Sequence, residues 1–470
     1  MVQHNRTLND EFELKGIWFL PMSKDRQVSG SLKYYRGDIQ LETIGLVEQV
    51  NQDFITLLKS SNQYPSNIPI ILGTAPTGEK ITLINSSRTT TSSSLTNLAT
   101  GIYHSYEMVI GKHFEKYEDI KFKSIHSTYS NLNVWYGKSG IRIITSDLKN
   151  NVLKFEQTPV EVTNAKIDDD FSLKIQVLPA ISKDITQSDL TVKETTSVSI
   201  VSQNLTPFKE LDELNRCVRY FLMLGMMHTV HPLTIVGYIN DEKIEMYPNY
   251  RLYDNIPKIV VSNDMLFTYH VISNNFESFI QSWRKLWLQY KDTIINYFST
   301  LLDEHLTIIE LQFQSIALAL ESYHREKFPD TSSSDEEYNK MIQGMISKVK
   351  DDPKQVRFIK RFKAMGNDPS LSERLHELVK ICPDMFKNSD EEKTEFVDKV
   401  SSTRNYFSHG SKELKEKAIT NFNELFYIIQ EMKILMEGCF LSELPFSQEK
   451  LQELIVKNRV VKNYAKEHSS

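Results

Sequence analysis

The chain has 470 residues, of which 40% are hydrophobic and 25% are charged, and its formal net charge is −6. This length exceeds what one ordinary core accommodates, so we expect two or three domains. The acidic balance excludes a protein coated in positive charge, and any nucleic-acid site must therefore be a local basic patch.

The first 200 residues carry mostly strand signals, which are short runs of β-branched and aromatic residues between turn residues. Many of these runs alternate apolar and polar residues, as half-buried antiparallel strands do. A serine- and threonine-rich stretch, Ser86–Ser94, is expected to be a surface loop. The expected strands are Phe12–Leu20, Leu32–Val47, Ile68–Leu72, Ile81–Ile84, Ile102–Ile110, Phe122–Tyr136, Ile141–Thr145 and Ser172–Val177.

A helix and a strand pair follow these strands and complete the N-terminal part. Leu205–Leu224 is predicted to be helical, with Thr206 as N-cap and Pro207 at the first helical position. The strand pair is Leu233–Ile239 and Lys243–Tyr247. We therefore predict a β-rich N-terminal domain over residues 1–275, built as a sandwich or a curved antiparallel sheet.

The helical period dominates from residue 276 onward. The sequence predicts an all-α C-terminal domain over residues 276–470, with its core at about 305–440, so the fold class is α+β. The expected helices are Phe276–Leu302, His305–Phe328, Glu337–Val349, Pro353–Met365, Leu371–Ile381, Glu391–Phe407, Lys412–Glu437 and Ser447–Lys457.

Cysteines and apolar segments indicate the compartment. Cys217, Cys382 and Cys439 form no pair with metal-ligand spacing, and their odd number suits a reducing compartment. The first ten residues lack the apolar stretch of a signal peptide. The most apolar segment, Val218–Val230, is shorter than the roughly 18–20 residues of a membrane span. We expect a cytoplasmic protein with no membrane partner.

Two motifs that could carry chemistry favour a structural interpretation. The segment Gly73–Lys80 resembles a phosphate-binding loop, but a strand follows it where such a loop must open a helix. A hairpin turn is the better interpretation. His228 and His231 have the spacing of two metal ligands, yet no third ligand lies nearby at a recognisable spacing, and Pro232 follows directly.

A basic segment is a candidate RNA-binding surface. On a helix Lys354, Arg357 and Arg361 would line one face, with Lys360 and Lys363 beside it. Such a stripe could bind RNA phosphates in a salt-sensitive way. The alternative is a solvated helix face balanced by the acidic segments around it. The helix also carries Phe358 and Phe362, which we expect to point into the core.

The strongest candidate is Arg404-Asn405-Tyr-Phe-Ser-His409-Gly410, at the end of a predicted helix for which Gly410 is a natural stop. Asn405 and His409 are four residues apart and share a helical face, while Arg404 precedes them by one position. All three side chains can approach one small volume if the last turn is slightly unwound.

These residue types suit RNA cleavage by the RNA's own 2′-hydroxyl, a group that DNA lacks. Histidine titrates near neutral pH, so His409 can remove or deliver a proton. The phosphorane that forms gains negative charge, and a guanidinium matches its charge and geometry. Asn405 can orient the phosphate or the histidine. The reaction requires no metal or cofactor. The alternative is structural: Arg404 pairs with an acidic neighbour and His409 caps a helix C-terminus.

The arginine–histidine pattern resembles the motif of HEPN domains (higher eukaryotes and prokaryotes nucleotide-binding), where it reads Arg-x4–6-His and an Asn often follows the arginine. Upstream, the segment around Glu321, from Ile316 to Glu326, resembles the early helix of that domain. The N-terminal part is similar to that of ApeA-type abortive-infection proteins of phage defence. This second similarity rests on Phe122-x2-Ile125, Asn131-Leu132-x2-Trp135-x-Gly137, Arg219-Tyr-Phe-Leu and His231-Pro-Leu-x-Ile235.

This resemblance implies a function that composition does not show. HEPN ribonucleases form homodimers through this domain, place two motifs at one cleft and cut RNA, often tRNA, without metal. In defence members the N-terminal domain would sense a phage-derived trigger. The C-terminal domain is acidic, so RNA binding would rest on a local patch such as Lys354, Arg357, Lys360 and Arg361. The second hypothesis is a non-catalytic protein that dimerises or binds nucleotides.

Overall fold

A computed structural model describes residues 6–48, 67–94, 97–147, 152–184, 189–249, 260–302, 308–328, 335–363, 366–381, 389–410 and 412–457. The chain divides into two compact units. We call them the β unit, which contains Met1–Leu222, Val230–Ser262 and Thr268–Ile280, and the helical unit, which contains Met223–Thr229, Asn263–Phe267 and Gln281–Ser470.

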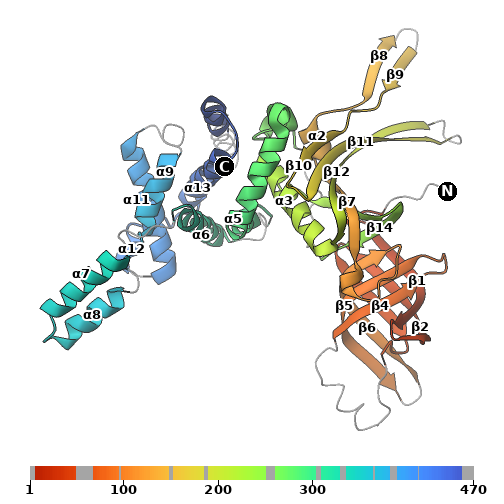
Figure 1. The fold of residues 1–470 in the computed structure, drawn as a ribbon, viewed down its shortest axis with the longest axis horizontal. Helices are drawn as coiled ribbons and strands as arrows, with labels where there is room; N and C mark the ends of the chain where they lie inside the picture. The colour runs from red at the N-terminus through yellow and green to blue at the C-terminus, as the bar shows by residue number, and fades with distance from the viewer. Residues whose placement is uncertain are drawn as a thin grey trace. The chain divides into compact units, whose positions relative to one another are not determined.

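One antiparallel sheet forms most of the β unit (Figure 1). Its order is β10-β11-β12-β7-β13-β14-β6-β3-β2-β1-β4-β5, and β5 also pairs with β6, so the last six strands close into a barrel. The strands are β1 (Glu11–Leu20), β2 (Ser23–Tyr35), β3 (Asp38–Ile44), β4 (Asn67–Thr74), β5 (Lys80–Ser94), β6 (Asn97–Ile110), β7 (Lys121–Tyr129), β10 (Thr163–Lys166), β11 (Phe171–Asp184), β12 (Asp189–Pro207), β13 (Pro232–Ile239) and β14 (Glu242–Tyr247).

The predicted β-rich N-terminal architecture is confirmed, with several local differences. A separate hairpin is formed by β8 (Ile141–Asp147) and β9 (Val152–Gln157), of which β9 was not predicted. The predicted loop Ser86–Ser94 is wrong, because this stretch lies in β5 and pairs with β6. Threonine suits strands, and its β-branched side chain outweighs the loop-like composition here. The predicted hairpin turn at Gly73–Lys80 is confirmed between β4 and β5.

The predicted strand Phe122–Tyr136 is correct only as far as Tyr129. Asn131 adopts a left-handed conformation with φ 57°, which ends the strand, and the short helix α2 (Leu132–Tyr136) follows. Asparagine tolerates this conformation better than most residues, which explains the reversal.

Helix α3 (Phe208–Met226) packs on β7, where the hydroxyl of Tyr129 donates to Asn215. The helix starts three residues later than predicted. Thr206 and Pro207 end β12, and the Thr206 hydroxyl donates to the carbonyl of Asn204 instead of capping the helix.

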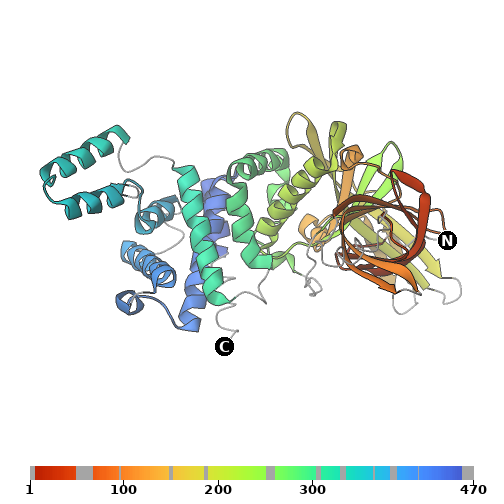
Figure 2. The same ribbon diagram turned by 90° about the horizontal axis from the view of Figure 1, so that it is seen from below.

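The helical unit is all-α, as predicted (Figure 2). Helix α6 packs against α9, α11 and α13, and the buried residues include Phe313, Leu320, Val400 and Phe440. The helices are α5 (Phe276–Leu302), which begins in the β unit, α6 (Ile309–Lys327), α7 (Asp335–Lys348), α8 (Pro353–Lys363), α9 (Leu371–Ile381), α11 (Asp390–His409), α12 (Lys412–Lys415), α13 (Phe422–Ser442) and a helix at 448–457.

Helices α7 and α8 form a hairpin that stands out from the other helices of this unit in both views (Figures 1 and 2). The predicted single helix Lys412–Glu437 is wrong. It is divided into α12 and α13, because Asn421 caps α13 by accepting from the amides of Asn423 and Glu424. The predicted helix start at His305, the predicted end at Met365 and Cys382 lie outside the described residues. None of the described helices is both long and apolar enough to cross a lipid bilayer.

A glycine in the barrel tests the packing of its core. A Cβ at Gly73 would lie 2.3 Å from the ring of Trp18, whose side chain is fully buried. We expect Gly73→Ala to destabilise the chain by roughly 1–3 kcal/mol, because overpacking shifts the ring or the backbone. Gly344, in α7, has open space around it, so Gly344→Ala should be neutral or stabilising by roughly 0.5–1 kcal/mol. If the thermal unfolding curves of the two variants coincided, the close contact between Gly73 and Trp18 would be contradicted.

Candidate active site at the end of helix α11

Helix α11 is defined at both ends by its own sequence. At the start, the Ser389 hydroxyl accepts from the amide of Glu392, as an N-cap does. At the end, Gly410 adopts φ 64°, and its amide donates to the carbonyl of Tyr406 at 2.7 Å. Glycine adopts this left-handed conformation without strain. The helix therefore runs regularly through His409 and stops there.

The end of α11 is held by a buried hydroxyl and an aromatic contact. Thr403 is fully buried, and its hydroxyl accepts from the amide of Ile419 at 2.9 Å, which ties the chain after α12 to the helix. Phe407 packs edge-on against Phe313 of α6, with ring centroids 5.7 Å apart. The backbone that carries Arg404, Asn405 and His409 is therefore fixed relative to α6.

Arg404 is ion-paired within the chain but still partly accessible. Its Nη2 lies 3.2 Å from Oε2 of Glu321 on α6, and its Nη1 donates to the side-chain oxygen of Asn405 at 3.4 Å. The side chain of Arg404 is 33% exposed, whereas that of Glu321 is 15% exposed. Glu321 also pairs with Arg325 at 3.0 Å. The Glu321 carboxylate thus faces two guanidinium groups, of which Arg325 also lies 3.9 Å from Asp368.

His409 is exposed and forms no hydrogen bond or ion pair with another described residue. In a regular helix, residues five apart differ by about 7.5 Å along the axis and by about 140° around it. Arg404 and His409 therefore leave α11 on different sides. The last turn of α11 is regular, so the slight unwinding that would bring all three side chains together is absent, although Arg404 does contact Asn405. Asn405 and His409 share a face, as predicted.

A buried polar cluster beside Glu321 was missed from the sequence. His324 of α6 and Arg374 of α9 are 1% and 3% exposed. The guanidinium of Arg374 is 3.0 Å from Nδ1 of His324, and Nε2 of His324 is 2.6 Å from a carboxylate oxygen of Glu377. Arginine can only donate, so Nδ1 must accept and Nε2 carries the proton. The cluster joins α6 to α9, and only the helical spacing of His324 and Glu321 hinted at it.

The neutral state of His324 follows from these contacts. Burial lowers the pKa of His324, although the hydrogen bond to Glu377 opposes the change. Burial also lowers the pKa of Arg374, which lies near Arg325. A proton on Nδ1 of His324 would face the guanidinium of Arg374, so the cluster is built for a neutral imidazole.

The basic helix α8 is fully exposed on its cationic side. Asp352 caps it by accepting from the amides of Lys354 and Gln355, and Pro353 opens it. None of the basic side chains of this helix forms an ion pair with another described residue. These side chains are Lys354, Arg357, Lys360, Arg361 and Lys363. The prediction that Phe358 and Phe362 point into the core is wrong, because they are 70% and 54% exposed. The helix contacts only α7 closely, so it has no core of its own.

The surface along the first half of α11 is acidic. An open hollow of about 930 Å³ is lined by Asp390, Glu391, Thr394, Glu395, Asp398, Lys399, Ser402 and Lys417. Neither Arg404 nor His409 lines it. An RNA phosphate would be repelled there, so a substrate would have to approach from the end of the helix.

The described residues contain no group of three or more His, Cys, Asp or Glu side chains that could hold a metal ion. His231 precedes β13, and its backbone pairs with Ser130.

Comparison with protein families assigns both parts of the chain. Residues 13–283, more than half of the sequence, match ApeA N-terminal domain 1. The chain belongs to the ApeA family. Residues 315–450 match the Apea-like HEPN domain, which contains Glu321, α8 and the whole of α11. No curated protein and no solved structure is significantly similar to it. The HEPN assignment supports a nuclease of the defence type.

The neutral histidine makes stability depend on pH. An unfolded histidine takes up a proton near its ordinary pKa of about 6.5, whereas folded His324 does so only at lower pH. We therefore expect the helical unit to lose stability as the pH falls below about 6.5, by at most ~1.4 kcal/mol per pH unit for this group. His324→Gln should reduce that slope. Urea denaturation at pH 7.5 and pH 5.5 measures this change in stability. An equal change in the unmodified chain and in His324→Gln would contradict the neutral state of His324.

Proposed function

We propose that this ApeA-family chain is a metal-independent endoribonuclease of phage defence that uses Arg404 and His409. Arg404 would bind the scissile phosphate and stabilise the charge that develops on it. His409 would act as general acid or base, and Asn405 would orient the phosphate or the imidazole. The observation that carries the proposal is the position of this motif inside the matched HEPN domain, at the exposed end of a firmly held helix.

The ion pair between Arg404 and Glu321 suits a site that binds an anion. The pair holds the guanidinium in one place, and Arg325 competes for the same carboxylate. A phosphate can therefore take over one edge of Arg404 without leaving Glu321 unpaired. Because this cation is held in place and partly exposed, it needs little rearrangement when charge develops on the substrate.

The divergence of Arg404 and His409 supports a homodimer. Because the two residues leave a regular α11 about 140° apart, a single chain places them poorly for one phosphate. A second copy related by a two-fold axis could supply the missing group, since a symmetric interface presents each residue twice. We propose that the HEPN domains dimerise and that each cut uses groups from both protomers.

We further propose that α8 binds the RNA strand. Its basic residues Lys354, Arg357, Lys360 and Arg361 would contact phosphates, and the exposed rings of Phe358 and Phe362 would stack on bases. A cationic helix with two exposed aromatic rings matches how proteins hold single strands. The substrate class is RNA in the cytoplasm, with tRNA as the candidate. The N-terminal domain, residues 1–275, would respond to a phage-derived trigger, and residues 276–470 would cut.

A non-catalytic HEPN protein that dimerises or binds nucleotides is the second candidate. The ion pair between Arg404 and Glu321 favours it, because a structural arginine would make the same contact. The two candidates differ in one respect: only the enzyme breaks an RNA phosphodiester bond.

Substitution of the motif tests the enzyme. We expect His409→Ala and Arg404→Ala each to lower RNA cleavage in EDTA by roughly 10²-fold or more, with unfolding unchanged for His409→Ala. His270→Ala, which removes another exposed histidine, should keep full activity. The assay incubates purified chain with tRNA and resolves the fragments on a gel. Cleavage in His409→Ala at the normal rate would refute the role of this residue.

Binding measurements test α8 separately from catalysis. In a His409→Ala background, Phe358→Ala with Phe362→Ala should weaken binding of a single-stranded RNA by roughly 5-fold or more, because each stacked base contributes ~1–3 kcal/mol. The matched control is Met341→Ala with Met345→Ala, which removes exposed apolar side chains from α7 of the same hairpin. An equal loss in the control would show a general apolar surface instead of stacking.

A further inference from the structure

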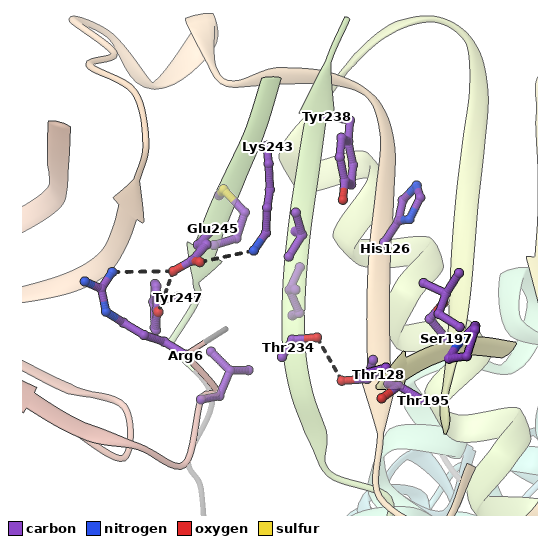
Figure 3. A pocket seen from close by; sticks show the side chains of 17 residues that line it. Arg6, His126, Thr128, Thr195, Ser197, Thr234, Tyr238, Lys243, Glu245 and Tyr247 are labelled. Atoms are coloured by element: carbon purple, nitrogen blue, oxygen red, sulfur yellow. Dashed lines mark hydrogen bonds and ion pairs between the residues drawn. The ribbon is translucent and has the colours of Figure 1, made fainter. Parts of the chain in front are cut away.

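The β unit contains a pocket that the proposed nuclease does not use (Figure 3). Its volume is about 310 Å³, at the small end of ligand pockets. The pocket is lined by strands β11, β12, β7, β13 and β14, and the segment with Arg6 and Leu8 lies at one side. Tyr129 of β7 bonds to α3, so alternate residues His126 and Thr128 face away from that helix. The pocket therefore lies on the sheet face opposite α3.

One end of the pocket is lined with hydroxyl groups. Thr128 and Thr234 are paired in register, and their hydroxyl oxygens are 2.8 Å apart. Figure 3 shows Thr195 and Ser197 close to them. Ser197 is 5% exposed, and its hydroxyl has no hydrogen-bond partner among the described residues. Ser199, which pairs in register with His126, is also buried without such a partner.

These orphaned hydroxyls point to a ligand. A buried polar group without a partner costs stability, and most such groups in native proteins are satisfied. Ser197 lines the pocket, and its missing hydrogen bond is explained if a bound molecule supplies it. A ligand with hydroxyl groups of its own can both donate to and accept from Ser197 and the nearby threonines.

The other end of the pocket is aromatic. The rings of His126 and Tyr238 are 4.5 Å apart and tilted by 49°, and Tyr238 is half-buried. Burial, with a contribution from Lys174, lowers the pKa of His126, so its imidazole is uncharged near neutral pH. A flat ring can stack beside such a pair.

The charged groups at the side of the pocket already neutralise one another. Arg6 forms a two-pronged pair with Glu79, at 2.9 and 3.0 Å. Glu245 lies 3.4 Å from Lys243 and 3.7 Å from Arg6, and it accepts from the hydroxyl of Tyr247 at 3.0 Å. A phosphate group would have to break one of these ion pairs, so the lining favours a ligand that carries no phosphate.

We propose that this pocket binds an uncharged ribonucleoside, with its base against Tyr238 and His126 and its ribose hydroxyls on Ser197 and the Thr128–Thr234 pair. A ribonucleoside combines the flat ring and the adjacent hydroxyls that the two ends require, and it carries no charge. This binding is independent of RNA cleavage by Arg404 and His409.

Calorimetry on the full chain tests the pocket with adenosine, guanosine, cytidine and uridine as probes. At least one should bind. Tyr238→Ala should weaken that binding at least 5-fold, while Tyr238→Phe keeps it, because stacking needs the ring and not the hydroxyl. Ser197→Ala should weaken it by roughly 3- to 10-fold. Ser31→Ala, which removes a half-buried hydroxyl of β2 that donates to Glu13, is the control outside the pocket and should bind like the unchanged chain.

Three results would overturn the proposal. One is the absence of binding by any of the four nucleosides at millimolar concentration. Another is equal binding of free ribose, which would mean that the aromatic end takes no part. The third is much tighter binding of the corresponding 5′-monophosphates, which would mean that the paired cations open for a charged ligand.

Discussion

The contact between Glu321 and Arg404 is the interaction on which the candidate active site depends. It joins α6 to α11, the helix that carries Arg404, Asn405 and His409, and it is supported by a buried hydroxyl at Thr403 and by the rings of Phe313 and Phe407. Next to it, a buried hydrogen bond between His324 and Arg374 connects α6 to α9. Buried polar groups of this kind are stable only when every partner is in place, so the three helices are held in one arrangement. The end of α11 is thus a rigid platform, as preorganised catalysis requires.

The same rigidity limits what one chain can do. Arg404 and His409 leave a regular helix on different sides, and Gly410 ends that helix immediately after the histidine. Acidic side chains line the hollow along its first half, whereas the unpaired positive charge lies on α8. The proposed RNA strand would therefore be favoured at the end of α11 and along α8, and disfavoured along the acidic face of α11. This charge distribution is compatible with the RNA binding proposed above, even though the net charge of the chain is −6.

Much of this could be predicted from the sequence because it rests on local patterns. Alternation over strands such as β1, the glycine stop after His409 and the spacing of Arg404, Asn405 and His409 are all visible without a structure. The closure of the barrel is not, because it depends on β5 pairing with both β4 and β6 over long separations. The burial of Arg374 was also hidden, since its partner His324 is 50 residues away. Phe358 and Phe362 were misjudged because a helical pattern shows a face but not whether anything covers it. The pocket on the β unit combines residues from several strands, and single-sequence patterns do not bring these together.

The central claim is that Arg404 and His409 act together on one phosphate only when two chains combine them. The most direct test mixes Arg404→Ala chains with His409→Ala chains after dissociation and reassociation, and measures tRNA cleavage in EDTA. In mixed dimers one chain supplies the guanidinium and the other the imidazole, so the account predicts that the mixture recovers a measurable fraction of normal activity while each variant alone stays inactive. A mixture that contains mixed dimers and is as inactive as its two components would contradict it.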